Sequence, residues 1–239
     1  MKKNYQNQFE DTIQRITVST CKQTMFEELR KGAVELEYDY FAFGYKSRFQ
    51  CSAPKIEAFN NYPSTWNKRY LDDNLAQVDP LLKLGMQTKN WINWDSVCRN
   101  EHLEFWEEAA SYGISHGISK PTHSTDGYSS MFSLARDTPS DIFKGQEVAP
   151  QTNLLYLTAE FAFSRLCKPS FIFEERPSLT KRELEILKWV SVGKSGVEIS
   201  IILGIAAKTV AFHMANINRK MGVTNKTAAA IKAVMMGLF

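Results

Sequence analysis

The chain has 239 residues, 44% of them hydrophobic and 23% charged, with a formal net charge of +3. This is the composition of an ordinary globular protein of one or two domains, without low-complexity tracts or internal repeats. Because no apolar run approaches the roughly 18 residues of a membrane span, and none follows Met1-Lys2-Lys3-Asn4, we expect neither a membrane partner nor a secretory signal.

The first part of the chain predicts two helices followed by two strands. Apolar residues recur at helical spacing in residues 4–18 and 22–36, which favours two amphipathic helices. Residues 38–45 are rich in aromatic side chains and break that period, so we expect a strand there. Residues 55–59 alternate in polarity and predict a second, shorter strand.

The next part predicts mainly helices. One helix begins near Pro63, because proline suits the first helical position. Asp79-Pro80 opens another, residues 91–94 form a short extended piece, and residues 101–112 form a further helix.

Two strands and a long helix complete the first domain in the predicted order. Residues 117–122 and 128–136 are expected to pair around a turn at residues 125–127. A long helix is expected over residues 141–166, and Pro150 is a possible break in it.

The order of these elements predicts an α+β fold with two domains. Helices and antiparallel strands favour an α-β-α sandwich with an antiparallel sheet for residues 1–167. Residues 168–177 contain prolines and charges without periodicity, so we expect a linker there. Residues 178–239 predict an all-α domain of four helices that carries a helix-turn-helix.

Start and stop signals define the helices of this second domain. Thr180 with Glu183, and Ser195 with Glu198, form two capping boxes. Gly204 is placed at the tight turn of a helix-turn-helix, and the following helix is expected from about residue 206 to 221.

The basic charge of the chain is concentrated in the second domain. Residues 178–239 hold nine Lys or Arg and three Asp or Glu, whereas the whole chain is only +3. A basic helix rich in hydrogen-bonding groups is suited to phosphates and base edges. The predicted DNA-binding residues are Lys194, Lys208, Thr209, His213, Asn216, Arg219 and Lys220.

A group of aromatic side chains and one carboxylate marks a candidate site in the first domain. Trp66, Tyr70, Asp79 and Trp94 combine large apolar surfaces with two kinds of donor and one acceptor. Taken alone, such aromatic residues are more often core residues, and an Asp before Pro is more often a helix N-cap.

Two sets of residues match the sequence pattern of one protein family. The C-terminal set is Leu179-Thr180-x-Arg182-Glu183-x-Glu185-Ile186-Leu187, Gly193-Lys194-Ser195, Glu198-Ile199, Thr209-Val210-x-Phe212-His213 and Asn225-Lys226. The N-terminal set is Asn61-Tyr62-Pro63-x-x-Trp66-x-x-x-Tyr70, Asp79-Pro80, Trp94, Phe105-Trp106-x-x-Ala109 and Tyr112-Gly113-Ile114-x-x-Gly117. With these, the chain resembles LuxR-type regulators. One departure is Ala206-Ala207, where the family usually has a serine that caps the recognition helix.

The resemblance implies a receptor for an N-acyl-homoserine lactone, with no cofactor. By the family pattern, Trp66 donates to the lactone carbonyl, Tyr70 donates to the amide carbonyl, and Asp79 accepts the amide N–H. Trp94 packs against the lactone ring, and Ser133 helps to hold the amide. The acyl tail is expected among Ala42, Ile56, Ala58, Tyr62, Leu82, Met86 and Met131.

The resemblance also implies a mode of action. A homodimer would bind a pseudo-palindromic DNA operator and regulate transcription in response to the ligand. Two alternatives stay open: a receptor for foreign or non-lactone signals, and a repressor that is active without ligand and released by it.

Two other classes of protein are disfavoured by the sequence. Residues 1–60 lack the order of acidic residues that a phosphoacceptor receiver needs, and no nucleophile elbow or phosphate-binding glycine loop points to an enzyme. The cysteines and histidines show no spacing of a metal site, which favours reduced thiols in a cytoplasmic protein. They are Cys21, Cys51, Cys98, Cys167, His102, His116, His123 and His213.

Overall fold

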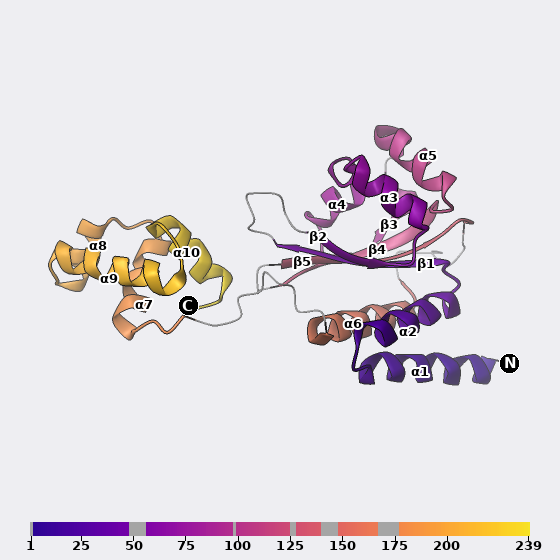
Figure 1. The fold of residues 1–239 in the computed structure, drawn as a ribbon, viewed down its shortest axis with the longest axis horizontal. Helices are drawn as coiled ribbons and strands as arrows, with labels where there is room; N and C mark the ends of the chain where they lie inside the picture. Colours follow the sequence, from indigo (N-terminus) through magenta and orange to yellow (C-terminus); the bar gives the residue numbers. More distant parts are fainter. Residues whose placement is uncertain (1, 48–55, 98, 125–127, 140–147, 167–176) are drawn as a thin grey trace. The chain divides into compact units, whose positions relative to one another are not determined.

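The computed structural model of the chain contains two compact units (Figure 1). It describes residues 2–47, 56–97, 99–124, 128–139, 148–166 and 177–239. The predicted linker, residues 168–177, lies outside the described residues except for Pro177, and so does the predicted turn at residues 125–127.

The first unit is built on a single antiparallel sheet with strand order β2-β1-β5-β4-β3. The prediction of an α+β fold with an antiparallel sheet is therefore confirmed. The strands are β1 (Tyr40–Ser47), β2 (Ile56–Asn60), β3 (Ile92–Asn93), β4 (His116–His123) and β5 (Tyr128–Arg136).

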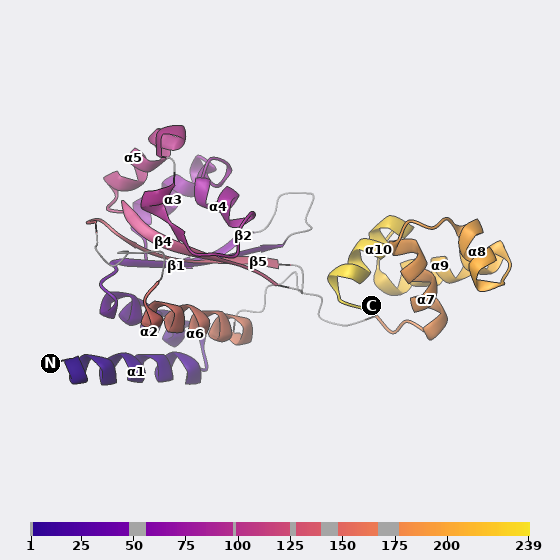
Figure 2. The same cartoon turned by 180° about the vertical axis from the view of Figure 1, so that it is seen from behind.

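Helices cover both faces of this sheet, which makes the predicted sandwich (Figures 1 and 2). One layer contains α2 (Lys22–Glu35) and α6 (Pro150–Leu166), and α1 (Lys2–Val18) packs on these two helices, farther from the sheet (Figure 1). The other contains α3 (Ser64–Asp72), α4 (Pro80–Gly85) and α5 (Leu103–Ser111). Short 3₁₀ turns lie at Leu75–Gln77, Trp94–Ser96 and Arg99–His102.

The alternation of side-chain size along β1 makes the two faces of the sheet different. Phe41, Phe43 and Tyr45 are buried, and the ring of Phe43 stacks on that of Phe163 in α6 with centroids 3.8 Å apart. Ala42 and Gly44 lie between them in sequence and face the opposite layer. One face of β1 therefore packs densely on helices, and the other is lined by small residues.

Two predicted boundaries are wrong at the edges of this unit. The long helix expected from residue 141 begins at Pro150, because Val148 and Ala149 are not helical, and residues 141–147 lie outside the described residues. Proline is tolerated in the first turn of a helix, where its missing N–H has no partner to lose. The first strand begins at Tyr40 and not at Tyr38, since the chain leaves α2 through Glu37 in a left-handed conformation (φ 62°).

The second unit is a four-helix domain with a helix-turn-helix, as predicted. Both capping boxes are present, with Thr180 accepting from the amide of Glu183 and Ser195 from that of Glu198. Gly204 is left-handed (φ 62°) at the turn between α8 and α9, a conformation that glycine adopts without steric cost. The helices are α7 (Lys181–Ser191), α8 (Gly196–Leu203), α9 (Ala207–Met221) and α10 (Lys226–Met235).

The start of α9 carries the departure from the family pattern. Ala206 is its N-cap and makes no side-chain hydrogen bond. Val210, Ile217 and Met221 of this helix are buried, and Ala211 is exposed.

Among the described residues no single helix is long and apolar enough to cross a membrane. Only the sharply bent pair of α8 and α9 passes that test together, by length and composition alone.

Candidate ligand cavity and DNA-binding helix

A cavity of about 850 Å³ lies in the first unit, lined by the small-residue face of the sheet and by residues of α3, α4 and α5. Its lining is predominantly apolar, as in most small-molecule sites. It contains all but one of the residues expected to bind a ligand: Ala42, Ala58, Tyr62, Trp66, Tyr70, Asp79, Leu82, Met86, Trp94, Met131 and Ser133. The exception is Ile56, which begins β2 and whose side chain lies outside the described residues.

The strands provide the floor of this cavity in a fixed register. Ala42 pairs with Ser133, and Gly44 lies between Met131 of β5 and Ala58 of β2. Because side chains alternate across a strand, these five residues project from the same face. The small side chains of β1 and β2 leave the space that a ligand would need.

Aromatic side chains from α3 form one wall. Trp66 and Tyr70 are one helical turn apart, and their rings meet edge to face with centroids 5.7 Å apart. Trp66 is only 4% exposed. Its indole N–H donates to no group within the described part of the chain, although it belongs to the cavity lining. A buried donor without a partner costs free energy, so this N–H is suited to receive a ligand acceptor.

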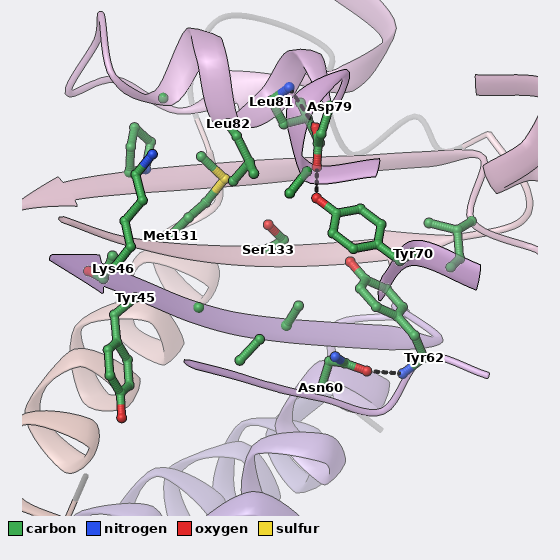
Figure 3. Close-up of a pocket in the computed structure, with 18 of the residues that line it drawn as sticks. Tyr45, Lys46, Asn60, Tyr62, Tyr70, Asp79, Leu81, Leu82, Met131 and Ser133 are labelled. Carbon is green, nitrogen blue, oxygen red and sulfur yellow. Dashed lines mark hydrogen bonds between the residues drawn. The ribbon is translucent and has the colours of Figure 1, made fainter. Parts of the chain in front are cut away.

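Asp79 occupies the end of the cavity where the polar groups converge (Figure 3). Its Oδ1 accepts the amide N–H of Leu81 at 2.8 Å, which caps α4. Its Oδ2 accepts the hydroxyl proton of Tyr70 at 2.7 Å. Asp79 is therefore both the N-cap of α4 and a residue of the cavity lining.

Burial shifts the acidity of both partners in this contact. It raises the pKa of Asp79 above its ordinary value, although the Tyr70 hydroxyl and the amides of Leu81 and Leu82 act in the opposite direction. Burial, with the nearby charge of Asp79, also raises the pKa of Tyr70. The surface of Asp79 that is not covered by protein faces the cavity. A donor placed in this cavity would therefore meet a poorly solvated carboxylate, which is a strong acceptor.

A chain of hydrogen bonds links the opposite wall to the sheet. The indole N–H of Trp94 donates to Ser119 Oγ at 2.9 Å, and that hydroxyl lies 2.8 Å from Ser133 Oγ. Gly117 makes room for the indole, because a Cβ there would lie 3.0 Å from the Trp94 ring. When Ser119 donates its own proton to Ser133, the Ser133 hydroxyl keeps a proton for a ligand.

Several lining residues were not singled out as ligand-binding from the sequence. The omitted lining residues include Gly44, Lys46, Asn60, Leu81, Gly85, Phe105, Trp106, Ala109, Ile114, Pro121, His123 and Ser129. Ser119, which does not line the cavity but holds Trp94 and Ser133, was also missed, although strand alternation places it on the same face of β4 as Gly117. Within the described residues, no cluster of three His, Cys, Asp or Glu could hold a metal ion.

The predicted DNA-binding residues are distributed over α9 and the turn before α8. Lys208, Thr209 and Arg219 are exposed, and Arg219 donates to Asn216 Oδ1 at 3.2 Å. His213 is half-buried, and its ring lies 5.8 Å from that of Phe212. All of the predicted residues except Lys194 therefore lie on α9.

Two of the predicted DNA-binding lysines are engaged in ion pairs. Lys194 Nζ lies 3.1 Å from Glu198. Lys220 Nζ lies 2.7 Å from Glu183, whose side chain is only 4% exposed. Burial raises the pKa of Glu183, but Lys220 and the amide of Thr180 outweigh that effect and hold it below the ordinary value. Lys220 therefore ties the recognition helix α9 to the start of α7.

In comparisons with known proteins, each of the two compact units matches a family of its own. The family described as "Autoinducer binding domain" matches residues 22–166, and "Bacterial regulatory proteins, luxR family" matches residues 177–233. Transcriptional activator protein AnoR of Acinetobacter nosocomialis is 34% identical over 96% of this chain and 98% of its own. The quorum-sensing regulator RhlR of Pseudomonas aeruginosa is 32% identical over 90% of both chains. The structure of SdiA in complex with octanoyl-rac-glycerol superposes with a TM-score of 0.75 at 26% identity, covering 97% of this chain and 95% of that one.

The raised pKa of Asp79 predicts a pH-dependent stability that Asp79→Asn removes. An acid whose pKa is raised by folding stabilises the folded state below its ordinary pKa of about 4, and this contribution is lost as pH rises through the raised value. Asparagine caps a helix as well as aspartate but does not titrate. Without ligand, the melting temperature of Asp79→Asn should therefore exceed that of the wild type increasingly as pH rises from about 4 to about 7. Parallel melting curves at all pH values would contradict the assignment.

Lys220→Ala and Lys208→Ala distinguish two roles of lysines on α9. Lys220 forms an ion pair that stabilises the fold, and Lys208 is expected to contact DNA. Removing Lys220 leaves the buried Glu183 carboxylate without its cation, at a cost of roughly 1–3 kcal/mol in unfolding free energy. Lys208 is exposed, so Lys208→Ala should leave stability unchanged and reduce the salt dependence of DNA binding by about one unit of slope. Denaturant titration and binding at several salt concentrations measure both effects. Equal stability of the two variants would show that the Glu183–Lys220 pair is unimportant.

Proposed function

The chain belongs to the LuxR family of autoinducer-binding transcription regulators, and from this premise we propose that it regulates transcription in response to an N-acyl-homoserine lactone. The domains would be a ligand-binding domain over residues 1–167, a linker over 168–177 and a DNA-binding domain over 178–239. The observation that carries the proposal is the mainly apolar cavity with Tyr70 and Asp79 hydrogen-bonded to each other at one end.

Hydrogen bonds to a ligand amide can replace the existing hydrogen bond between Tyr70 and Asp79. At present, Tyr70 donates its only hydroxyl proton to Asp79. A bound amide would donate its N–H to Asp79 instead, and its carbonyl would accept the proton that Tyr70 no longer uses. Each buried group would keep a partner, and this condition excludes ligands that lack a donor next to an acceptor.

The remaining polar groups suit the lactone carbonyl and the second lone pair of the amide carbonyl. The Trp66 indole N–H is available for the lactone carbonyl, and the Ser133 hydroxyl can donate to the amide carbonyl beside Tyr70. Trp94 uses its N–H on Ser119, so its contribution would be the face of its ring, packed against the lactone. The roles inferred from the family pattern are thus compatible with the geometry.

A second candidate ligand class is an acyl compound without a lactone. One solved structure contains SdiA in complex with octanoyl-rac-glycerol, which carries an acyl chain on a small polar head. A receptor for foreign or non-lactone signals would use the same tail region with different head-group contacts. A repressor that ligand releases from DNA is also compatible with this cavity.

Apolar surface on α6 supports a homodimer. Leu154, Leu157 and Phe161 are 42%, 59% and 51% exposed, and their spacing of three and four residues places them on one side of the helix. On α10, Ile231 and Val234 are also exposed. Soluble proteins rarely leave aligned apolar side chains uncovered, and a second copy of the chain is the partner that a symmetric regulator needs.

Ligand binding would act through the folded population of the protein. A lactone that fills the cavity stabilises the first domain by mass action, and a homodimer would then place two α9 helices on half-sites about one helical turn apart, or a multiple of that. Lys208, Thr209, His213, Asn216 and Arg219 would contact phosphates and bases in the cytoplasm. The decisive experiment measures soluble yield, melting temperature and reporter transcription with a panel of lactones. Asp79→Asn serves as the control that should not respond, and a fully responsive Asp79→Asn would refute the assignment of the cavity.

Trp66→Phe should weaken the response without emptying the cavity wall. Phenylalanine keeps an aromatic ring but loses the N–H that would bind the lactone carbonyl, so the half-maximal lactone concentration should rise roughly tenfold. Trp91→Phe is the matched control, because the Trp91 indole donates to Asn153 of α6 and is not part of the cavity lining. Identical dose curves for wild type and Trp66→Phe would make Trp66 a core residue only.

Leu157→Glu should convert the dimer to a monomer. A charge in the centre of the α6 stripe cannot be buried against a second copy without a large desolvation cost. Leu103→Glu, on α5, is the control, because Leu103 is similarly exposed (51%) but lies in the opposite layer. Sedimentation equilibrium should show dimers for the wild type and Leu103→Glu only. Dimers of Leu157→Glu would exclude this surface.

A further inference from the structure

Met131 lies in the part of the cavity expected to hold the acyl tail. Its methyl group ends against Gly85 on α4, in the space left by the missing side chain, which is called the notch below. Figure 3 shows its side chain rising from β5 toward Leu82. A Cβ added to Gly85 would lie 2.2 Å from Met131 Cε and 3.5 Å from Pro121 Cβ. Gly85 is not among the glycines with positive φ, so its backbone conformation does not require glycine. What requires it is the close approach of the Met131 methyl group.

The register of β5 gives the position of Met131 along a bound tail. Ser133, Met131 and Ser129 follow one another on the cavity face at intervals of roughly 7 Å, since a strand rises about 3.4 Å per residue. An extended chain advances about 1.2 Å per bond. A tail whose amide lies at Ser133 would reach Met131 after about six bonds and Ser129 after about eleven.

The far end of the tail region is polar. Lys46 pairs with Ser129 across β1 and β5, and Ser129 pairs with His123 of β4, so the three residues form one row across the sheet. His123 Nδ1 lies 3.0 Å from Ser129 Oγ, and Lys46 Nζ lies 3.6 Å from Met86 Sδ. An apolar tail gains nothing by burying these groups, so the row is expected to be the limit of its path.

We propose that Met131, held on Gly85, is the residue that determines which acyl-tail lengths this protein accepts. With its methyl group in the notch, the Met131 side chain leaves room for tails of about seven to eleven atoms to pass toward the polar row. Shorter tails end before they reach Met131. This inference rests on the proposed function and adds the length class of the ligand to it.

Gly85→Ala tests the notch directly. Alanine favours a helix more than glycine does, so the backbone of α4 should tolerate the change. The added methyl group displaces the end of Met131, which is flexible and moves into the nearest open space, the cavity. Affinity for N-decanoyl-homoserine lactone should fall about tenfold, as expected when about two methylene groups lose their burial. Affinity for N-butanoyl-homoserine lactone should change by less than about twofold, because its tail ends before Met131.

Two further variants complete the experiment. The double variant Gly85→Ala with Met131→Ala should regain the binding of the decanoyl ligand, because no side chain is left to be displaced. Met131→Phe should reproduce the selective loss through a different residue, because a rigid ring cannot enter the notch. Isothermal titration of the full-length wild type and the three variants with both lactones provides the affinities, and the melting temperature without ligand shows that each variant is folded.

The outcomes separate this inference from the proposed function. Equal loss of both ligands in Gly85→Ala, no loss of either, or a double variant that stays impaired would overturn the role of Met131 while leaving a lactone receptor. A wild type that binds neither lactone would overturn the proposed function, and the role of Met131 with it.

Discussion

The buried carboxylate of Asp79 connects the fold of the first unit with its cavity. One oxygen caps α4 through the amide of Leu81, and the other accepts the hydroxyl proton of Tyr70 from α3. The same group therefore joins two helices of the layer over the sheet and lies in the wall of the cavity. Because burial raises its pKa, Asp79 is an unfavourable place for a charge in the empty protein. A ligand that supplies an N–H would relieve this cost, so binding and folding are expected to be coupled.

The cavity exists because the two faces of the sheet carry side chains of different size. On one face, Phe41 and Phe43 pack against helices, and that layer is dense. On the other, Ala42, Gly44 and Ala58 leave a hollow that the helices cover without filling. Both faces carry buried aromatic side chains, but on the cavity side Trp66, Trp94 and Trp106 line the hollow.

Local signals in the sequence were enough to predict much of this arrangement, and long-range contacts were not. The capping boxes at Thr180 and Ser195 and the proline after Asp79 act over a few residues, so the helices they start were identified correctly. Which residues surround a ligand was inferred from a family pattern and could not come from periodicity. Ser119, Gly85 and the pairing of Lys220 with Glu183 were missed, because each depends on a contact between elements far apart in the sequence. Alternation along β4 was the only signal that could have identified Ser119.

The most direct measurement of the central claim is the NMR spectrum of a lactone with a ¹⁵N-labelled amide, bound to the full-length protein. If the Asp79 carboxylate accepts this N–H, its proton resonance should move strongly downfield from that of the free ligand and exchange slowly with water. Both effects should disappear when the ligand is added to Asp79→Asn. A bound amide proton that resonates and exchanges as in free solution, or one unaffected by Asp79→Asn, would contradict the account.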